Sequence, residues 1–172
     1  KEIEKMRKAG LITGGALVAA GEAIHAGMTT KELDTVVRKY ITSHGAKPSF
    51  LGYGGFPGSA CISINDVVIH GIPGPQVIKD GDIVSVDVGA YIGGFHGDSC
   101  KTFAVGEVSE EAKALMKSTE ESLYLAISMV KPGVRLGDLG AAIQKYNEDN
   151  GYGVVREFVG HGVGRDLHED PE

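Results

Sequence analysis

The sequence predicts an α+β fold made of a duplicated αβ unit, and three observations lead to that prediction. Long segments with helical periodicity alternate with short strand-like segments along the 172 residues. Residues 82–103 have the alternation of a β-hairpin around a glycine pair. Residues 27–45 align without a gap, at an offset of 106 positions, with residues 133–151. Both copies follow a long helical segment and precede a strand-like segment that ends in His-Gly, which favours a true repeat.

The repeat divides the chain into a first unit of about residues 1–106 and a second of about residues 107–172, within one single domain. Five of the nineteen aligned positions are identical, which alone is weak support because helices share periodicity. If the units are equivalent, the second lacks about forty residues, including the counterpart of the hairpin. We therefore expect the second unit to be incomplete.

The elements follow in order from local signals. Apolar residues at helical spacing predict a first helix within residues 1–26. Thr29 and Glu32 form a capping-box pattern that begins a second helix, which should end near His44 with Gly45 as its left-handed stop. Residues 49–60 read as a glycine-rich loop carrying three exposed aromatic side chains.

The next segments continue the pattern. Residues 61–73 predict a strand, or a pair of strands broken at Asn65-Asp66, with His70 at its far end. Ser109 is a suitable N-cap for another long helix, which Pro132-Gly133 should end.

Composition limits the function classes. With 42% hydrophobic and 23% charged residues, the chain can form a core, and no apolar run approaches the roughly 18–20 residues of a membrane span. A net charge of −6 and no concentrated basic segment argue against nucleic-acid-specific binding. Two cysteines and no apparent signal peptide indicate free thiols and a cytoplasmic location.

Two aspartates in the hairpin are unexpected, because aspartate is depleted in strands. If Gly93-Gly94 is the turn, Asp87 and Asp98 become diagonal neighbours on the polar face, about 7–8 Å apart at the backbone. Two carboxylates directed at one point require a proton or cation between them, as in hydrolases with two divalent ions. The alternative is that both aspartates cap loops or face water.

The histidines add nitrogen donors. His161 lies between Gly160 and Gly162, which allow backbone and solvent to approach the imidazole, and His70 also precedes a glycine. With His168, these residues and the aspartates are typical of a hydrolytic metal site. His25 and His44 are interpreted as surface or core residues. No Walker loop, serine-hydrolase elbow or dinucleotide fingerprint is present.

The motifs "SINDVVIHGIP", "DGDIVSVDVGAYIGGFHGDSCKTF", "MVKPGV", "AIQKY" and "VVREFVGHGVGRDLHEDP" together resemble the type I methionine aminopeptidases over essentially the whole chain. That resemblance implies the pita-bread fold, with duplicated αβ units related by pseudo-twofold symmetry. It implies a hydrolase that removes the initiator methionine from nascent chains with a small second residue. It also implies two divalent metal ions, which could be Co, Mn, Fe or Zn.

The resemblance also suggests residue roles. Asp87, Asp98 and His161 would be metal ligands, with Asp98 shared between the two ions. His70 would contact the substrate amine or scissile nitrogen, and His168 would stabilise the developing oxyanion. The apolar pocket for methionine would be lined by four residues, for which core packing is the alternative: Tyr53, Phe56, Cys61 and Leu167. His96 receives no role, and Cys100 is not expected to be a ligand.

The chain departs from the family pattern after Glu172, because members of the family supply two further glutamate ligands beyond this point. We therefore expect a fragment with weak metal binding and little activity in isolation. Two other functions stay open: a non-catalytic peptide-binding module of the same fold, and an Xaa-Pro peptidase. A monomer is expected, and the sequence leaves ribosome association undecided.

Overall fold

A computed structural model describes all residues from Lys1 to Glu172, and they divide into two compact units. The first unit contains Lys1–Val108 together with Gly160–Glu172, and the second contains Ser109–Val159. The repeat assigned residues 160–172 to the second unit, whereas in the structure they pack with the first. A backbone hydrogen bond of 2.8 Å from His96 N–H to the Gly164 carbonyl illustrates the attachment.

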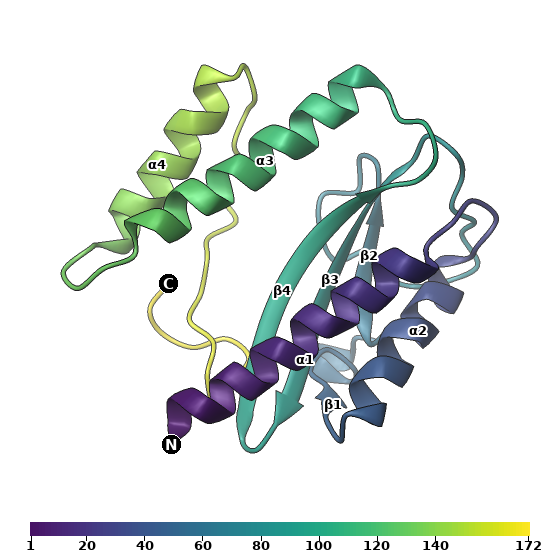
Figure 1. The fold of residues 1–172 in the computed structure, drawn as a ribbon, viewed down its shortest axis with the longest axis horizontal. Coiled ribbons are helices and arrows are strands. Elements are labelled where there is room, and N and C mark those ends of the chain that lie inside the picture. Colours follow the sequence, from purple (N-terminus) through teal and green to yellow (C-terminus); the bar gives the residue numbers. More distant parts are fainter. The chain divides into compact units, whose positions relative to one another are not determined.

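The first unit is built on one four-stranded antiparallel sheet (Figure 1). Its strands are β1 (Lys47–Pro48), β2 (Ala60–Ile64), β3 (Ile83–Ile92) and β4 (Phe95–Ala104). β3 is central, because it pairs with β4 along its whole length and with β1 and β2 on its other edge. The short 3₁₀ helix η1 (Tyr53–Gly55) lies in the loop between β1 and β2.

Helices α1 (Glu2–Ala23) and α2 (Thr30–Ser43) pack against this sheet (Figure 1). Alternate valines of β3 (Val84, Val86 and Val88) are fully buried and face the helices. The core contains Ile12 and Leu17 from α1 and Leu33, Val37 and Ile41 from α2. The other face of the sheet is therefore the one that carries the polar side chains of the hairpin.

The boundaries of α2 follow the predicted signals. Thr29 Oγ1 accepts from Glu32 N–H at 3.2 Å, and the Glu32 carboxylate accepts from Thr29 N–H at 2.8 Å. The helix ends at Ser43, and Gly45 adopts a φ of +72°. The capping box and the glycine stop are both confirmed.

The hairpin register is also confirmed. Gly93 and Gly94 have φ values of +63° and +87°, which glycine adopts without the steric cost that other residues incur. Ile92 pairs with Phe95, Gly89 with Asp98, and Asp87 with Cys100.

The break predicted at Asn65-Asp66 is confirmed, but the second strand of the predicted pair does not form. β2 ends at Ile64, and Asn65 turns the chain with a φ of +53°. The Asn65 side chain accepts from Ile83 N–H at 3.0 Å and donates to Asp82 at 2.8 Å. These bonds stop the strand after the turn, so His70 lies in a loop, with a φ of +57°, instead of at a strand end.

The second unit contains α3 (Glu110–Met129) and α4 (Leu136–Asp149), which pack against each other. The bounds of α2, shifted by the 106-residue offset, coincide with those of α4, and the last residue of α1 coincides with that of α3. At the position equivalent to Glu32, the Asp138 carboxylate accepts from Arg135 N–H at 3.2 Å. The helices of the two units thus confirm the repeat read from the sequence.

The strand-like segment of the second copy forms no strand. Residues 152–159 are irregular and largely exposed, whereas the strand-like segment that precedes His70-Gly71 in the first copy contains β2. A strand is stable only when a neighbour accepts its backbone hydrogen bonds, and β2 has β3 beside it. None of the helices is long and apolar enough to span a bilayer.

Candidate active site

The two aspartates of the hairpin lie on the sheet face opposite the helices, as the alternation predicts. Asp87 is central, with Cys61 of β2 and Cys100 of β4 as its register partners on either side. Asp98 lies across from Gly89, diagonal to Asp87. The prediction that the two carboxyl groups share one face is therefore confirmed.

Both carboxyl groups are costly to ionise in this position. Burial is the main cause that raises the pKa of Asp87, and the neighbouring Asp98 carboxylate raises it further. Burial also raises the pKa of Asp98, although His161 and His168 partly offset this effect. Such a pair is favourable only with a proton or a cation between the two acids. The hypothesis that both aspartates face open water is wrong, since the Asp98 side chain is only 19% exposed.

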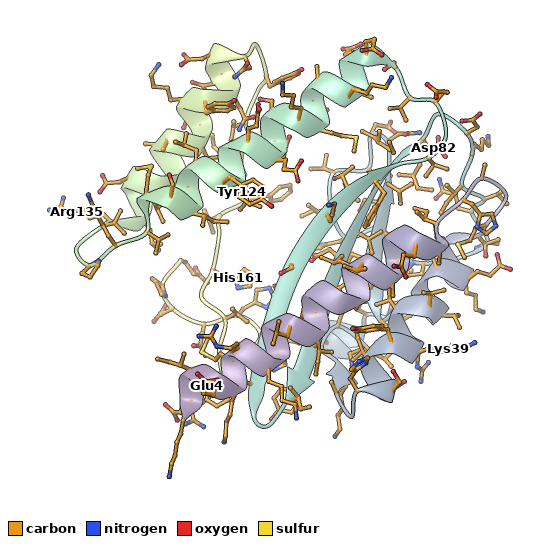
Figure 2. All side chains as sticks on the ribbon, in the orientation of Figure 1. Glu4, Lys39, Asp82, Tyr124, Arg135 and His161 are labelled. Carbon is orange, nitrogen blue, oxygen red and sulfur yellow. The ribbon has the colours of Figure 1, made fainter.

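His161, which is labelled in Figure 2, brings an imidazole to this pair. Its Nε2 lies 3.5 Å from Asp98 Oδ2. Its Nδ1 lies 2.8 Å from the Gly162 carbonyl oxygen, which can only accept, so Nδ1 carries the proton. The unprotonated Nε2 is therefore on the side of Asp98, as a metal ligand requires.

The loop that carries His161 is held by its own backbone. Gly162 donates to the Pro171 carbonyl at 2.9 Å and accepts from Glu169 N–H at 3.0 Å. A Cβ on Gly162 would lie 2.5 Å from the Asp170 carbonyl oxygen, whereas Gly160 has no atom within 4 Å of that position. Of the two glycines beside His161, only Gly162 is needed for a close approach.

Glu169 takes part in this loop and does not point at the aspartates. Its Oε2 accepts from Asp166 N–H at 3.2 Å. The loop is also tied to the rest of the first unit, because Arg165 pairs with Glu2 and its guanidinium lies 5.0 Å from the centre of the Phe95 ring. Glu169 thus belongs to the same loop as His168.

His168 lies beside His161. Their ring centres are 4.1 Å apart, and His168 Nδ1 shares a hydrogen bond of 3.0 Å with Tyr53 Oη. The Tyr53 ring stacks on His168 with centres 5.3 Å apart. Residues from three separate segments, β4, η1 and the C-terminal loop, therefore meet at one place.

A small apolar cluster adjoins these residues. Phe50, Cys61 and Leu167 are buried together, and Phe56 packs against them. Three of the four residues predicted for the methionine pocket are thus neighbours. Tyr53 is not in the cluster and is 53% exposed.

The sequence missed Phe50, which was expected to be exposed but is only 8% exposed. A Cβ on Gly89 would lie 2.8 Å from the Phe50 ring and 2.7 Å from Ser49 Cβ. Gly89 therefore makes room for this segment. The sequence signal that could have predicted this contact is the glycine within the strand, because a strand glycine often marks a place where another segment approaches the sheet closely.

His96, which received no role from the sequence, connects two of these segments. Its Nδ1 shares a hydrogen bond of 2.8 Å with Ser49 Oγ, and its backbone N–H donates to Gly164. Burial lowers the pKa of His96. It therefore joins the loop of Phe50 to the loop of His161.

His70 is not brought into contact with these residues. It is exposed, and its side chain makes no hydrogen bond, ion pair or ring contact. The structure thus groups eight of the nine predicted site residues around the hairpin face and leaves His70 on a separate loop.

The donors of this site fit a divalent cation by their chemistry. Carboxylate oxygen and neutral imidazole nitrogen are ligands that Mn, Fe, Co and Zn accept. The buried acid pair and the unprotonated Nε2 of His161 both favour a cation between them. No three His, Cys, Asp or Glu side chains converge closely enough to enclose an ion, so the side chains must move together to bind one.

Paired carboxylates and an imidazole on this fold indicate a metal-dependent hydrolase, and the similarity of the chain to known proteins agrees with that class. The pattern of metallopeptidase family M24 matches residues 4–172. The chain belongs to this family, and it is therefore a hydrolase of the metallopeptidase type, which implies divalent metal ions.

Its relatives within the family include methionine aminopeptidases. The chain is 53% identical over 171 residues to a methionine aminopeptidase of Clostridium perfringens, covering 99% of this chain and 69% of that protein. It matches the crystal structure of a methionine aminopeptidase of Thermotoga maritima with a TM-score of 0.96 and 48% identity, over 99% of this chain and 69% of that one.

A prolidase of Pyrococcus horikoshii is less similar, with a TM-score of 0.86, 29% identity, and coverage of 99% and 48%. These neighbours confirm the pita-bread fold for the part of it that this chain contains. The chain spans about 69% of the length of the methionine aminopeptidases it matches.

Proposed function

We propose that this chain is the part of a methionine aminopeptidase that carries its hairpin and histidine ligands, and that the enzyme removes an N-terminal methionine from peptides with a small second residue. The observation that carries the proposal is the meeting of Asp87, Asp98 and His161 on one face of the sheet. Identities near 50% to methionine aminopeptidases support the same activity.

Asp87, Asp98 and His161 are the residues that would hold two divalent ions. When bound, such ions supply Lewis-acid activation of the carbonyl group and of water. The two carboxylates balance the positive charge, and burial strengthens that attraction because little water screens it. The His161 Nδ1–H, bound to the Gly162 carbonyl, keeps the imidazole oriented with Nε2 towards Asp98.

The remaining residues would bind the substrate. His168 is placed beside His161 to donate a hydrogen bond to the scissile carbonyl as negative charge develops there. The cluster of Phe50, Phe56, Cys61 and Leu167 offers an apolar surface for the methionine side chain. The His70 imidazole has no partner in the structure and is free to bind the substrate amine.

The two rival functions are less well supported. The prolidase match has 29% identity against 48% for the aminopeptidase match, so an Xaa-Pro peptidase is the weaker choice. A pure peptide-binding cleft has no need of two buried acids in contact, since their burial costs stability unless a cation or proton lies between them.

Activity on nascent chains implies a cytoplasmic enzyme. We propose a monomer whose partners are the N-termini of newly made proteins. Binding assays with ribosomes would test whether it also docks there. Co, Mn, Fe and Zn are all compatible with the donor set.

The test is methionine release from Met-Ala-Ser with Mn²⁺ or Co²⁺, combined with calorimetric titration of Mn²⁺. Asp98→Asn removes a ligand charge with little change in shape, and Asp149→Asn on α4 is the matched surface control. We expect weak Mn²⁺ binding and slow release, both lost in Asp98→Asn and kept in Asp149→Asn. Equal binding and release in wild type and Asp98→Asn, or faster cleavage of an Xaa-Pro peptide, would contradict the proposal.

A further inference from the structure

The hydroxyl of Tyr53 makes a hydrogen bond that a residue lining an apolar pocket would not need. Tyr53 lies 115 positions from His168 in the sequence, yet its Oη is 3.0 Å from His168 Nδ1 and the two rings stack. The buried apolar cluster beside it excludes Tyr53, whose side chain is 53% exposed. The contact with His168 is thus the main polar interaction of this side chain.

This hydrogen bond bears on the position of the proton of His168. A neutral imidazole has one N–H and one acceptor nitrogen, and the partner of each nitrogen selects between the two tautomers. A phenol is the more acidic donor and an imidazole nitrogen the more basic acceptor, so the favoured arrangement has Tyr53 O–H donating to Nδ1. The proton of His168 is then on Nε2.

The neighbouring His161 has the opposite arrangement. Its Nδ1–H donates to the Gly162 carbonyl, so its Nε2 is unprotonated. Two imidazoles with ring centres 4.1 Å apart therefore present different groups: a lone pair on His161 and an N–H on His168. One is suited to a cation and the other to an oxyanion.

We propose that Tyr53 is a positioning residue that holds His168 in its Nε2–H tautomer and fixes the ring plane, so that His168 donates to the substrate carbonyl. The role of His168 in this statement rests on the proposed aminopeptidase function. The tautomer itself does not, because it follows from the Tyr53 contact alone.

The test uses Tyr53→Phe, which removes only the hydroxyl, and Tyr124→Phe on α3 as a control, because Tyr124 is 61% exposed and has no polar partner. In the ¹⁵N-histidine-labelled protein at about pH 8.5, where ordinary imidazoles are neutral, long-range ¹H–¹⁵N spectra report which nitrogen carries the proton. His168→Gln assigns the signals.

We expect wild-type His168 to be protonated on Nε2, with the two nitrogen shifts widely separated. In Tyr53→Phe the two shifts should move towards each other, while Tyr124→Phe matches the wild type. Methionine release measured on the same samples should show a kcat about two- to tenfold lower in Tyr53→Phe with KM little changed.

Protonation of wild-type His168 on Nδ1, or identical His168 shifts in wild type and Tyr53→Phe, would overturn the inference. If the tautomer is as expected and the wild type releases no methionine, the proposed function fails while the positioning role of Tyr53 stands. If methionine is released and His168 has the other tautomer, the proposed function stands and the positioning role of Tyr53 fails.

Discussion

The contact between Gly97 of β4 and α1 provides a sharp test of how packing positions the site. A Cβ on Gly97 would lie 2.7 Å from the carbonyl carbon of Ala9 and 2.8 Å from the amide nitrogen of Gly10. Both are backbone atoms and cannot rotate away. In Gly97→Ala the helix must retreat by about 0.7 Å to restore a contact of 3.4 Å.

The expected loss of stability in Gly97→Ala follows from the absence of free space at this contact. Ala9 and Thr13 are both fully buried beside Gly97. Overpacking a dense core costs about 1–3 kcal/mol, and a retreating helix also loses dispersion contacts with β4. We expect Gly97→Ala to lower the free energy of unfolding of the first unit by about 2–3 kcal/mol.

Gly10→Ala is the matched control, because it adds the same methyl group to α1, the helix that Gly97 contacts. Gly10 is exposed and has nothing within 4 Å of its Cβ position. Replacing a glycine inside an exposed helix by alanine stabilises by about 0.5–1 kcal/mol. The two variants should therefore change stability in opposite directions.

The assay is urea unfolding at equilibrium, followed by the NMR amide signals of β3 and β4, so that the reporters lie in the first unit. Because Asp98 is the neighbour of Gly97 in β4, Mn²⁺ affinity should fall in Gly97→Ala and stay unchanged in Gly10→Ala. Wild-type stability of Gly97→Ala, or an equal loss in both variants, would refute the packing argument.

Three further predictions concern a cap, a loop and a helix pair. The backbone N–H and hydroxyl of Thr29 lower the pKa of Glu32 below its ordinary 4.5. The cap therefore stabilises the protein above that pH, and its contribution is lost as the pH falls through the lowered pKa. In Glu32→Gln the free energy of unfolding should depend less steeply on pH in this range, and an unchanged pH dependence would contradict the prediction. Gly162→Ala should abolish nuclear Overhauser contacts between the 160–172 loop and β4 because its Cβ meets backbone, whereas Gly160→Ala should retain them. Ser118→Ala removes a buried 2.9 Å hydrogen bond between α3 and α4 and should destabilise that pair by about 1–2 kcal/mol in urea unfolding, unlike an exposed serine-to-alanine change.

Local sequence signals predicted the parts of the fold that depend on few neighbouring residues. The capping box at Thr29 and the paired glycines at 93–94 each act over a few positions, and both are present as predicted. The glycine turn and strict alternation set the hairpin register, which placed Asp87 and Asp98 on one face. The repeat likewise predicted the bounds of α4 from those of α2.

Predictions that depended on distant contacts were less accurate. The break at Asn65-Asp66 was predicted, but the second strand expected between it and His70 is absent, and the Asn65 side chain bonds instead to the start of β3. Phe50 was expected to be exposed, but it packs on Leu167 from the far end of the chain. Neither partner is visible in the local pattern, because each lies many residues away.

The sequence by itself therefore determined the helices, the hairpin register, the acid pair and the family resemblance, since these depend on short-range geometry and residue type. Only the tertiary structure decided that residues 160–172 join the first unit and bring His161 to Asp98. It also paired Tyr53 with His168 across 115 positions. Such contacts depend on how the chain closes long loops in space, which no periodicity in the sequence reports.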